Sequence, residues 1–565
     1  LVQHSMAMSP QAGDALYAFV LGLLALVPCA SGSQIEGPGS PIQACDKELD
    51  VLVLGAGIAG VKAAATLNEG GVSKLAVLEQ SHRLGGRMWN TEWEGHSIEL
   101  GANWIEGIPQ KENPIWSIAQ RIGLRGNYTD QEGSPIEPEL YASNGKVSSR
   151  EAVALHKRLG LALDGAYNIS CDHHHRDLGD LSLREALTQA GWPPRAQQTA
   201  LERTLEFFVV DWDFEYSPEE VSTFNYFDVG KVGSWHEACK HRGRKVNYMR
   251  ARTAARLGML GDFSWEAPRY FVTDPRGYAA VAEYVAQAFL TDSGSAPSVS
   301  HTNGTEQPGA HPECARPRLL FNKTVVAIRY GDTRNGNLGV RVETSDGSVY
   351  WAKRCIVTFS SGVVNDAIQS GKLFYPELPQ WKADAFSKAQ NGIYTKIFLR
   401  FPWRFWDNSD YVLFADSTRR GYYAVWQDME SHRKFFPMGS KILMVTVVQK
   451  ESERVEKQPQ ERTISELLGV LKQMYGPDIP QPLDTLIPKW YSNPSFRGCW
   501  SNIAIGTPGN TYDLMQKEVG GLFFAGEATD YEFNGFVLGG YHSGETVATK
   551  ALASLKVDRA LPVVI

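Results

Sequence analysis

The chain has 565 residues, of which 43% are hydrophobic and 21% are charged, and its formal net charge is −7. This length exceeds what a single hydrophobic core usually supports, so at least two domains are expected. The negative charge argues against nucleic-acid binding and suits a cationic partner.

The N-terminal region predicts a secretory signal. Residues 15–27 form an apolar run that is too short to span a bilayer and is followed by the small residues Ala30 to Ser33. We therefore expect residues 1–33 to be a signal peptide and 34–46 a linker, with a disordered tail as the alternative. Four glycosylation sequons agree with secretion: Asn127, Asn168, Asn303 and Asn322. The expected destination is extracellular, with the vacuole as the alternative.

Residues 49–106 predict a dinucleotide site. A buried strand leads into a turn with Gly55, Gly57 and Gly60, and the helix that follows places its positive end at the phosphates. The first glycine permits the tight turn, the second lets a pyrophosphate approach the backbone, and the third lets the helix pack on the strand. Glu79 closes the next strand, where an acid accepts hydrogen bonds from a ribose. NAD and FAD both fit this segment.

Further along the chain, residues 126–265 are predicted to be mostly helical. Within them, Asp172 to Arg176 includes three consecutive histidines, which we interpret as a surface loop and not as a metal site. Residues 229–260 carry eight Lys or Arg and one Glu. This segment is either a basic surface helix or an intron retained in the gene prediction.

Residues 319–328 and 340–344 alternate like antiparallel strands. Another predicted strand, 394–399, carries Lys396 in an apolar setting, where an ammonium is costly unless it is neutralised or hydrogen-bonded. Six cysteines follow the predicted signal peptide without a metal-binding spacing, so one disulfide is possible but its pairing is not readable.

Four motifs occur in one order: Leu84 to Arg87, Gly101 to Glu106, Phe524 to Thr529, and Asn534 to Val537. With them the chain resembles the flavin-containing amine oxidases, and among them the plant-type extracellular polyamine oxidases, over about residues 47–555. The resemblance implies an α/β fold, with a Rossmann-like FAD-binding domain of the p-hydroxybenzoate hydroxylase and amine oxidase type. A second, α+β substrate-binding domain would be built from interleaved segments.

The resemblance places the FAD-binding domain at 47–125, 266–369 and 486–555, and the substrate-binding domain at 126–265 and 370–485. The basic segment 229–260 has no counterpart in that family. The residues expected to bind FAD are Gly55, Gly57, Gly60, Glu79, Gly85, Gly86, Arg87, Gly101, Ala102, Asn103, Trp104, Val325, Gly526, Glu527, Phe536 and Val537.

The resemblance also implies a substrate tunnel and a catalytic lysine. Lys396 would hold a water against flavin N5. The residues expected to bind substrate are Glu106, Asp213, Tyr394, Trp500, Phe536 and Tyr541. Asp213 stands where the family normally has a Glu, so its reach is one methylene shorter. Because no Cys follows Cys499, we expect the FAD to be non-covalent.

The function implied is oxidation of spermine or spermidine at a carbon next to a secondary amine. Oxygen would be the acceptor, and an aminoaldehyde, an amine and hydrogen peroxide the products. The enzyme is expected to be a monomer in the apoplast. It would have no nucleic-acid partner and no membrane association after signal cleavage.

Two alternatives stay open. The first is another flavin amine oxidase, acting on monoamines, amino acids or methylated lysine, although the sequence identifies no arginine placed for an amino-acid carboxylate. The second is an inactive relative that binds FAD and polyamine. Glu rather than His at position 106 favours terminal catabolism over back-conversion.

Overall fold

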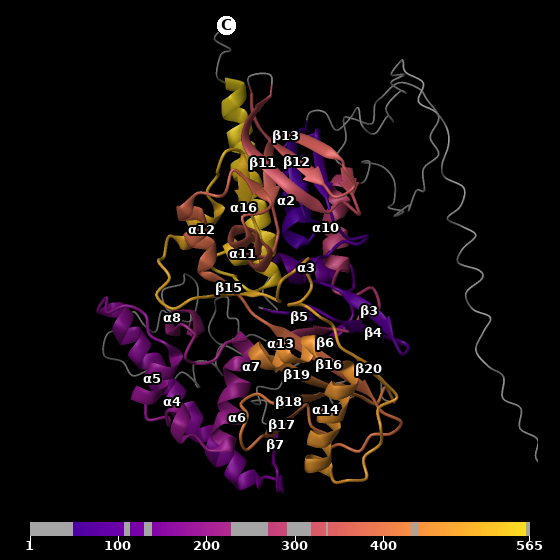
Figure 1. The fold of residues 1–565 in the computed structure, drawn as a ribbon, viewed down its shortest axis with the longest axis vertical. Helices are drawn as coiled ribbons and strands as arrows, with labels where there is room; N and C mark the ends of the chain where they lie inside the picture. The colour runs from indigo at the N-terminus through magenta and orange to yellow at the C-terminus, as the bar shows by residue number, and fades with distance from the viewer. Residues whose placement is uncertain are drawn as a thin grey trace, which may run out of the picture. The chain divides into compact units, whose positions relative to one another are not determined.

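A computed structural model describes residues 49–106, 113–128, 138–227, 269–290, 318–334, 337–430, 436 and 439–560, all within one compact unit, Cys45–Ile565 (Figure 1). The predicted signal peptide and linker, Asn303 and the basic segment 229–260 lie outside the described residues.

The first of two large sheets has eight strands, with β1, β2, β13 and β22 running parallel. Its order is β10 (Arg318–Leu320), β2 (Leu75–Leu78), β1 (Leu49–Leu54), β13 (Val349–Val357), β12 (Asn337–Thr344), β11 (Val325–Arg334) and β14 (Phe374–Tyr375), and β22 (Leu522–Phe524) pairs with β13. The expected strand at 319–328 is two strands, because the chain turns at Asn322 with a φ of 58°.

Helices cover both faces of this sheet because β1 is buried on both. Val51 and Val53 point to one core, and Leu52 and Leu54 to the other. The first core contains α2 (Ile58–Glu69), α3 (Pro114–Arg121), α10 (Ala280–Leu290) and α16 (Val537–Ala560) (Figure 1). The second contains α11 (Ser361–Ser370), α12 (Gln380–Ser387) and α15 (Thr511–Gln516).

The second large sheet has seven strands. Its order is β20 (Asp484–Leu486), β16 (Tyr394–Arg400), β19 (Ile442–Val448), β18 (Val425–Asp428), β17 (Tyr411–Ala415), β7 (Glu139–Ala142) and β8 (Gly145–Lys146). One of its cores includes α4 (Ser149–His175), α5 (Leu183–Gln189) and α6 (Ala200–Val209). Another includes α13 (Gln449–Lys457) and α14 (Gln460–Tyr475).

Short elements connect the two sheets. They are β3 (Asn90–Trp93) with β4 (His96–Glu99), β15 (Ala389–Asn391) with β21 (Ser501–Ile503), and the small sheet β5 (Trp104–Ile105), β9 (Tyr270–Val272) and β6 (Gly126–Tyr128). The remaining helical turns are η1 (Arg195–Gln197), α7 (Asp211–Phe214), α8 (Thr223–Tyr226) and η4 (Glu527–Thr529). The predicted α/β fold with a second α+β portion is confirmed.

The prediction of a loop at the three histidines is wrong. His173 to His175 form the last turn of α4, whose N-cap is Ser148. Successive helical side chains point about 100° apart, so three in a row do not converge on one ion. Among the described residues no group of His, Cys, Asp and Glu is arranged to hold a metal.

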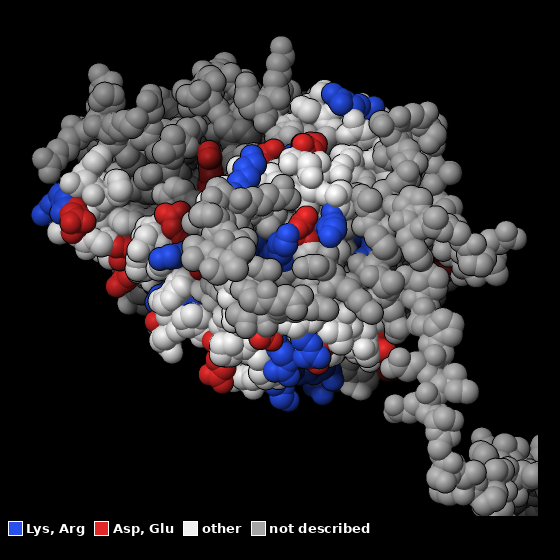
Figure 2. Space-filling model, turned by 90° about the horizontal axis from the view of Figure 1, so that it is seen from above, with Lys and Arg blue, Asp and Glu red and all other residues white. Residues whose placement is uncertain are grey.

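Two surface properties bear on the class of protein. Within the described ranges, no helix is both long and apolar enough to cross a bilayer. On the face shown in Figure 2, Lys and Arg side chains of the described residues lie among Asp and Glu side chains, so the described part of that face is mixed in charge.

Cys355 and Cys499 are free, and Cys171 is disulfide-bonded.

Candidate active site

A cavity of about 610 Å³ extends from the β1–α2 turn to the second sheet. Segments that are distant in sequence line it: the turn at Gly55, the loop at Gly85, the strand at Tyr394 and the segment around Trp500. The cavity therefore joins the predicted cofactor segments to the strands of the second sheet.

The glycine turn has the geometry that a dinucleotide requires. Gly55 has a φ of +105°, and a Cβ on Gly60 would lie 1.9 Å from the Gly55 carbonyl oxygen, so the helix can pack this closely only without a side chain. A Cβ on Gly57 would have its nearest neighbour 3.9 Å away, and Gly57 lines the cavity. No side chain caps α2 at Gly57, which leaves its N-terminal N–H groups for a phosphate.

Glu79 closes this end of the cavity. Its carboxylate accepts hydrogen bonds from the Ala56 N–H at 2.8 Å, and from the Ser81 N–H at 2.8 Å and hydroxyl at 2.7 Å. The side chain is thus held at the turn, where it can meet a ribose. These observations fit the dinucleotide reading of the motif.

The second glycine loop is held by an arginine that the sequence did not single out. Arg83 donates to the carbonyl oxygens of Leu84, Gly86 and Met88, and its guanidinium lies 4.4 Å from the centre of the Trp89 ring. Burial lowers the Arg83 pKa to about 10. A cation holding three carbonyls fixes the loop that places Gly85 and Gly86 beside Gly57.

A partly buried ion pair connects the motif at Leu84 to Arg87 with the motif at Phe524 to Thr529. Arg87 Nη1 lies 2.8 Å from Glu527 Oε1 and also donates to the Cys499 carbonyl at 2.6 Å. The other Glu527 oxygen accepts from the Ser501 hydroxyl at 2.6 Å and from the Gly535 N–H at 2.8 Å. Residues from three distant segments thus fix one carboxylate at the cavity wall.

Lys396 lies in the cavity wall, on the apolar strand β16. Its Nζ donates to the Gly101 carbonyl oxygen at 2.6 Å, which joins β16 to the predicted flavin-ring segment. The side chain is 5% exposed, and burial lowers its pKa to about 8. The lysine can therefore exchange a proton near neutral pH.

Glu99 is an acid close to Lys396 that sequence reasoning missed. Burial raises its pKa to about 7. A hydrogen bond from the Tyr278 N–H and the positive charge of Lys396 both act to lower the pKa, but burial has the larger effect. The Glu99 carbonyl oxygen also lies 3.4 Å from Lys396 Nζ. A burial signal of this kind depends on tertiary packing and is invisible in sequence.

Glu106 also lines the cavity, but with a partner that was not predicted. Arg269 Nε lies 3.0 Å from Glu106 Oε2, and both residues belong to the cavity wall. The Glu106 backbone carbonyl accepts from the Asn113 side chain at 2.7 Å. An arginine therefore does stand in this cavity, although the sequence did not identify it.

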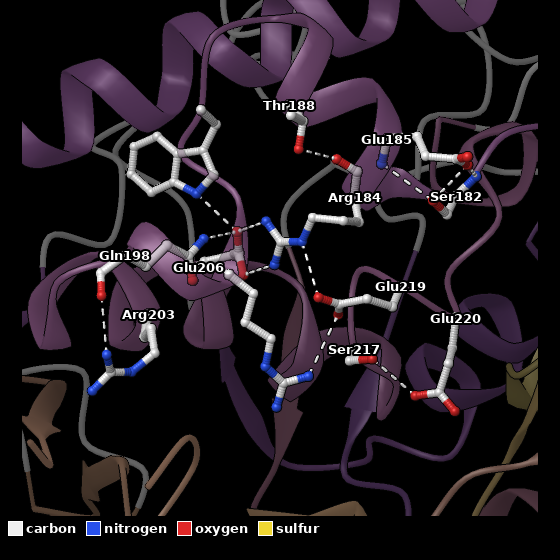
Figure 3. Close-up of polar contacts among 12 residues, drawn as sticks. Ser182, Arg184, Glu185, Thr188, Gln198, Arg203, Glu206, Ser217, Glu219 and Glu220 are labelled. Atoms are coloured by element: carbon white, nitrogen blue, oxygen red, sulfur yellow. Dashed lines mark hydrogen bonds and ion pairs between the residues drawn. The ribbon is translucent and has the colours of Figure 1, made fainter. Parts of the chain in front are cut away.

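Asp213 lines the cavity from α7, and a buried ion network holds that turn. On the opposite side of the turn, the Asp211 carboxylate accepts hydrogen bonds from Arg420 Nε at 3.0 Å and from Arg420 Nη2 at 2.5 Å. Arg420 also lies 2.9 Å from Glu206. Figure 3 shows how Glu206 pairs with Arg184. Glu206 also accepts from the side chains of Trp192 and Gln198.

Glu215, two residues beyond Asp213, is a second acid that the sequence did not single out. It is fully buried with a φ of 59°, and no hydrogen bond of good geometry reaches its carboxylate oxygens from the described residues, whereas its backbone carbonyl accepts from the Gln449 side chain. Burial, and then the charge of Glu527, raise its pKa well above the ordinary value. The Glu215 side chain packs against Gly392, and a Cβ on residue 392 would occupy the space of the Glu215 carboxylate.

Aromatic side chains form the walls between these polar groups. The rings of Tyr394 and Trp500 lie 5.1 Å apart, and Phe536 belongs to the same lining. Cys499 also lines the cavity, with its thiol donating to the Tyr394 carbonyl at 3.2 Å. Burial raises the pKa of this thiol, so it stays neutral.

Tyr541 differs from its expected position. It does not belong to the cavity lining, and its ring lies 4.9 Å from Lys62 Nζ on the side of α2. The reason is helical geometry: α16 begins at Val537, which does line the cavity, and Tyr541 is one turn further along the axis. Gly60 also lies outside the lining, consistent with its packing role.

A comparison with protein-family models matches residues 58–552 to the flavin containing amine oxidoreductases. The chain belongs to this family. Its cofactor is accordingly FAD, which the glycine turn and Glu79 fit. It is thus an FAD-dependent amine oxidoreductase.

Relatives agree with the family assignment. The chain is 33% identical to polyamine oxidase 1 of Zea mays, over 95% of each chain. It is 32% identical to polyamine oxidase 7 of Oryza sativa subsp. japonica, over 93% of this chain and 98% of the relative. A redesigned putrescine oxidase has the same fold, with a TM-score of 0.60, 16% identity, and coverage of 90% of this chain and 99% of that one.

The cavity brings together most residues assigned to FAD by motif and resemblance. Those in the lining are Gly55, Gly57, Glu79, Gly85, Gly86, Arg87, Gly101, Ala102, Asn103, Trp104, Val325, Gly526, Glu527, Phe536 and Val537. In this amine oxidoreductase they would hold the cofactor. Lys396, Glu106, Asp213, Tyr394 and Trp500 lie in the same lining.

Proposed function

We propose that this amine oxidoreductase oxidises polyamines such as spermine and spermidine. The observation that carries the proposal is one cavity that combines the FAD residues, two carboxylates at Glu106 and Asp213, and a wall of aromatic rings. Polyamines are flexible cations with apolar methylenes between their charges, so they match this lining. The two similar plant proteins described as polyamine oxidases support the same substrate class.

The protein's part in the reaction follows from where its groups lie. Glu106 and Asp213 hold ammonium groups, and the rings of Tyr394 and Trp500 contact the chain between them through dispersion and cation–π attraction. The apolar walls favour the uncharged form of the amine next to the reacting carbon. The residues of the FAD motifs would hold the cofactor non-covalently beside that carbon, and FAD would supply the hydride acceptor and the route of the electrons to oxygen.

Lys396 is placed to handle the proton and the water that the reaction needs. Its pKa of about 8 lets it exist in both protonation states near neutral pH. Its hydrogen bond to Gly101 holds it at the flavin-ring segment, where it would position a water. Hydrolysis of the oxidised amine then gives an aminoaldehyde and an amine, with hydrogen peroxide from oxygen.

Peroxide release from the purified holoenzyme tests this proposal. We expect turnover with spermine and spermidine and little with tyramine or a neutral amino acid. Activity restricted to tyramine or the amino acid would contradict it. Product analysis with spermine then distinguishes terminal catabolism from back-conversion. Glu rather than His at position 106 favours terminal catabolism.

An amine that carries a carboxylate is the second candidate substrate. Arg269 lines the cavity and could receive such a carboxylate. It is, however, engaged by Glu106 at 3.0 Å, which favours the polyamine reading. The same peroxide assay with lysine and arginine as substrates tests this candidate.

We further propose that the protein is a monomer secreted to the apoplast, of the plant extracellular type. The apolar run at residues 15–27 supports secretion. Asn322 lies in an exposed turn, so its sequon is accessible to a glycan. Recovery of a glycosidase-sensitive protein from apoplastic fluid, with a mature N-terminus near residue 34, is the expected result, and an intracellular unglycosylated protein would contradict it.

A further inference from the structure

Glu106 and Arg269 face each other across two paired strands. In the antiparallel pair of β5 and β9, Ile105 is opposite Tyr270 and Trp104 is opposite Phe271. The next residue on each strand is therefore Glu106 opposite Arg269. Backbone pairing thus fixes this ion pair, and its 3.0 Å separation is a direct result of strand register.

The pair belongs to the cavity and not to the outer surface. The exposed fractions of the two side chains are 28% for Arg269 and 16% for Glu106, and both line the cavity. Reduced contact with water strengthens the attraction between opposite charges compared with a fully exposed pair. In the resting protein, a guanidinium thus already neutralises the carboxylate assigned to substrate.

We propose that Arg269 is a specificity-determining residue that competes with the substrate's ammonium for Glu106. The proposal rests on the proposed function. A polyamine must displace the guanidinium, and contact of a second ammonium with Asp213 compensates for that displacement. A monoamine has no second charge to offer, so the pair selects against it.

The first test is Arg269→Gln in the FAD-loaded full-length protein. Spermine should bind about fivefold more tightly, which corresponds to loss of one competing ion pair. We would measure the dissociation constant by anaerobic calorimetric titration of holoenzyme whose flavin has been reduced with dithionite, so that substrate is not consumed. KM should fall in parallel while kcat changes little, because Arg269 would act on binding and not on the reacting carbon.

A double-variant cycle distinguishes an Arg269 that competes with substrate for Glu106 from an Arg269 that orients Glu106 for substrate binding. Glu106→Gln should weaken spermine binding, since it removes the carboxylate and leaves the Arg269 charge facing the substrate. Adding Arg269→Gln to that variant should restore part of the affinity. If Arg269 instead orients Glu106, the single variant Arg269→Gln binds spermine more weakly, and the inference is overturned.

Arg125→Gln is the matched control. It removes the same charge from a residue just before β6, the other strand that pairs with β9, and its side chain is 70% exposed and 3.9 Å from Asp274. Its spermine affinity should equal that of the wild type. Equal tightening in both variants would also overturn the inference, because it would reflect net charge alone. If the wild-type protein binds no polyamine, the proposed function fails together with this inference.

Discussion

At the residue scale, Lys396 lies in an environment unlike that of an ordinary surface lysine. Three features coincide there: burial in β16, a hydrogen bond to the flavin-ring segment and an acid, Glu99, nearby. Burial favours the neutral form of the amine, which is why its pKa lies at about 8. The residue can thus act in proton transfer, whereas a surface lysine stays charged.

Lys396→Met should slow kcat with spermine by about 10²–10⁴-fold, the usual contribution of a positioned acid–base group. The wild-type kcat profile should show a step near pH 8, set by the Lys396 pKa, and the variant should lack it. The spermine dissociation constant should change little. Lys450→Met, at an exposed position just beyond β19, is the control and should retain both turnover and the step. Unchanged turnover in Lys396→Met would remove this lysine from the mechanism.

The same pKa has a consequence for stability. Because the folded pKa lies below the unfolded value, the unfolded chain binds more protons between about pH 8 and about pH 10.4. The free energy of unfolding contributed by Lys396 should therefore rise with pH across this window. Denaturation of the wild type and Lys396→Met at pH 8 and pH 10 checks this, and identical pH dependence in both would contradict it.

At the scale of elements, the β1–α2 turn separates two kinds of glycine. A Cβ on Gly60 collides with the Gly55 carbonyl, whereas a Cβ on Gly57 meets no atom closer than 3.9 Å and would enter the cavity. Gly60→Ala should therefore lower the thermal stability of the apoprotein. Gly57→Ala should leave that stability within about 0.5 kcal/mol of the wild type but reduce the flavin retained, measured by absorbance. Full flavin retention in Gly57→Ala would show that the phosphates lie elsewhere.

The docking of α6 and α7 on the second sheet depends on Arg420. It lies in the β17–β18 turn, is 7% exposed, and contacts both Asp211 and Glu206. A Cβ on the neighbouring Gly421 would lie only 2.4 Å from the Phe207 ring, so the turn can pack this closely on α6 only with a glycine there. This arrangement holds the turn that places Asp213 in the cavity wall.

Arg420→Met should destabilise the protein by about 3–5 kcal/mol, because it leaves the buried Asp211 carboxylate without its arginine and removes one of the two arginines that pair with Glu206. Arg419→Met, in the same turn, removes an exposed partner of Glu451 and should cost less than about 1 kcal/mol. Chemical denaturation of both variants gives the comparison. Equal destabilisation would show that the network does not hold α6 and α7 in place.

For the whole molecule, the sequence predicted the parts that local rules determine. The glycine turn was readable because few residues fit that backbone. A charge in an apolar strand drew attention to Lys396, but its role beside the flavin came only from the family resemblance. The α/β fold followed from the motifs and their order. The two-strand structure around Asn322 and the helical ending at the histidines were not predicted, because they depend on pairing partners and on a distant N-cap.

The arginine and the acid that sequence reasoning missed in and beside the cavity depend on contacts between distant segments. Arg269 meets Glu106 only through the register of β5 and β9, and Glu215 becomes buried only when α7 packs beside Gly392. Tyr541, in contrast, was predicted to contact substrate but lies outside the cavity lining. It is one turn into α16, and its ring lies beside Lys62. Sequence motifs therefore located the cofactor more completely than the substrate side.

The central claim is that polyamines deliver electrons to the flavin of this protein. The most direct measurement is the rate of flavin bleaching when purified holoenzyme is mixed with spermine, spermidine, tyramine or lysine without oxygen. We predict rapid, complete bleaching with spermine or spermidine, and much slower bleaching with the other two. A flavin that stays oxidised with both polyamines, or that bleaches only with tyramine or lysine, would contradict the account.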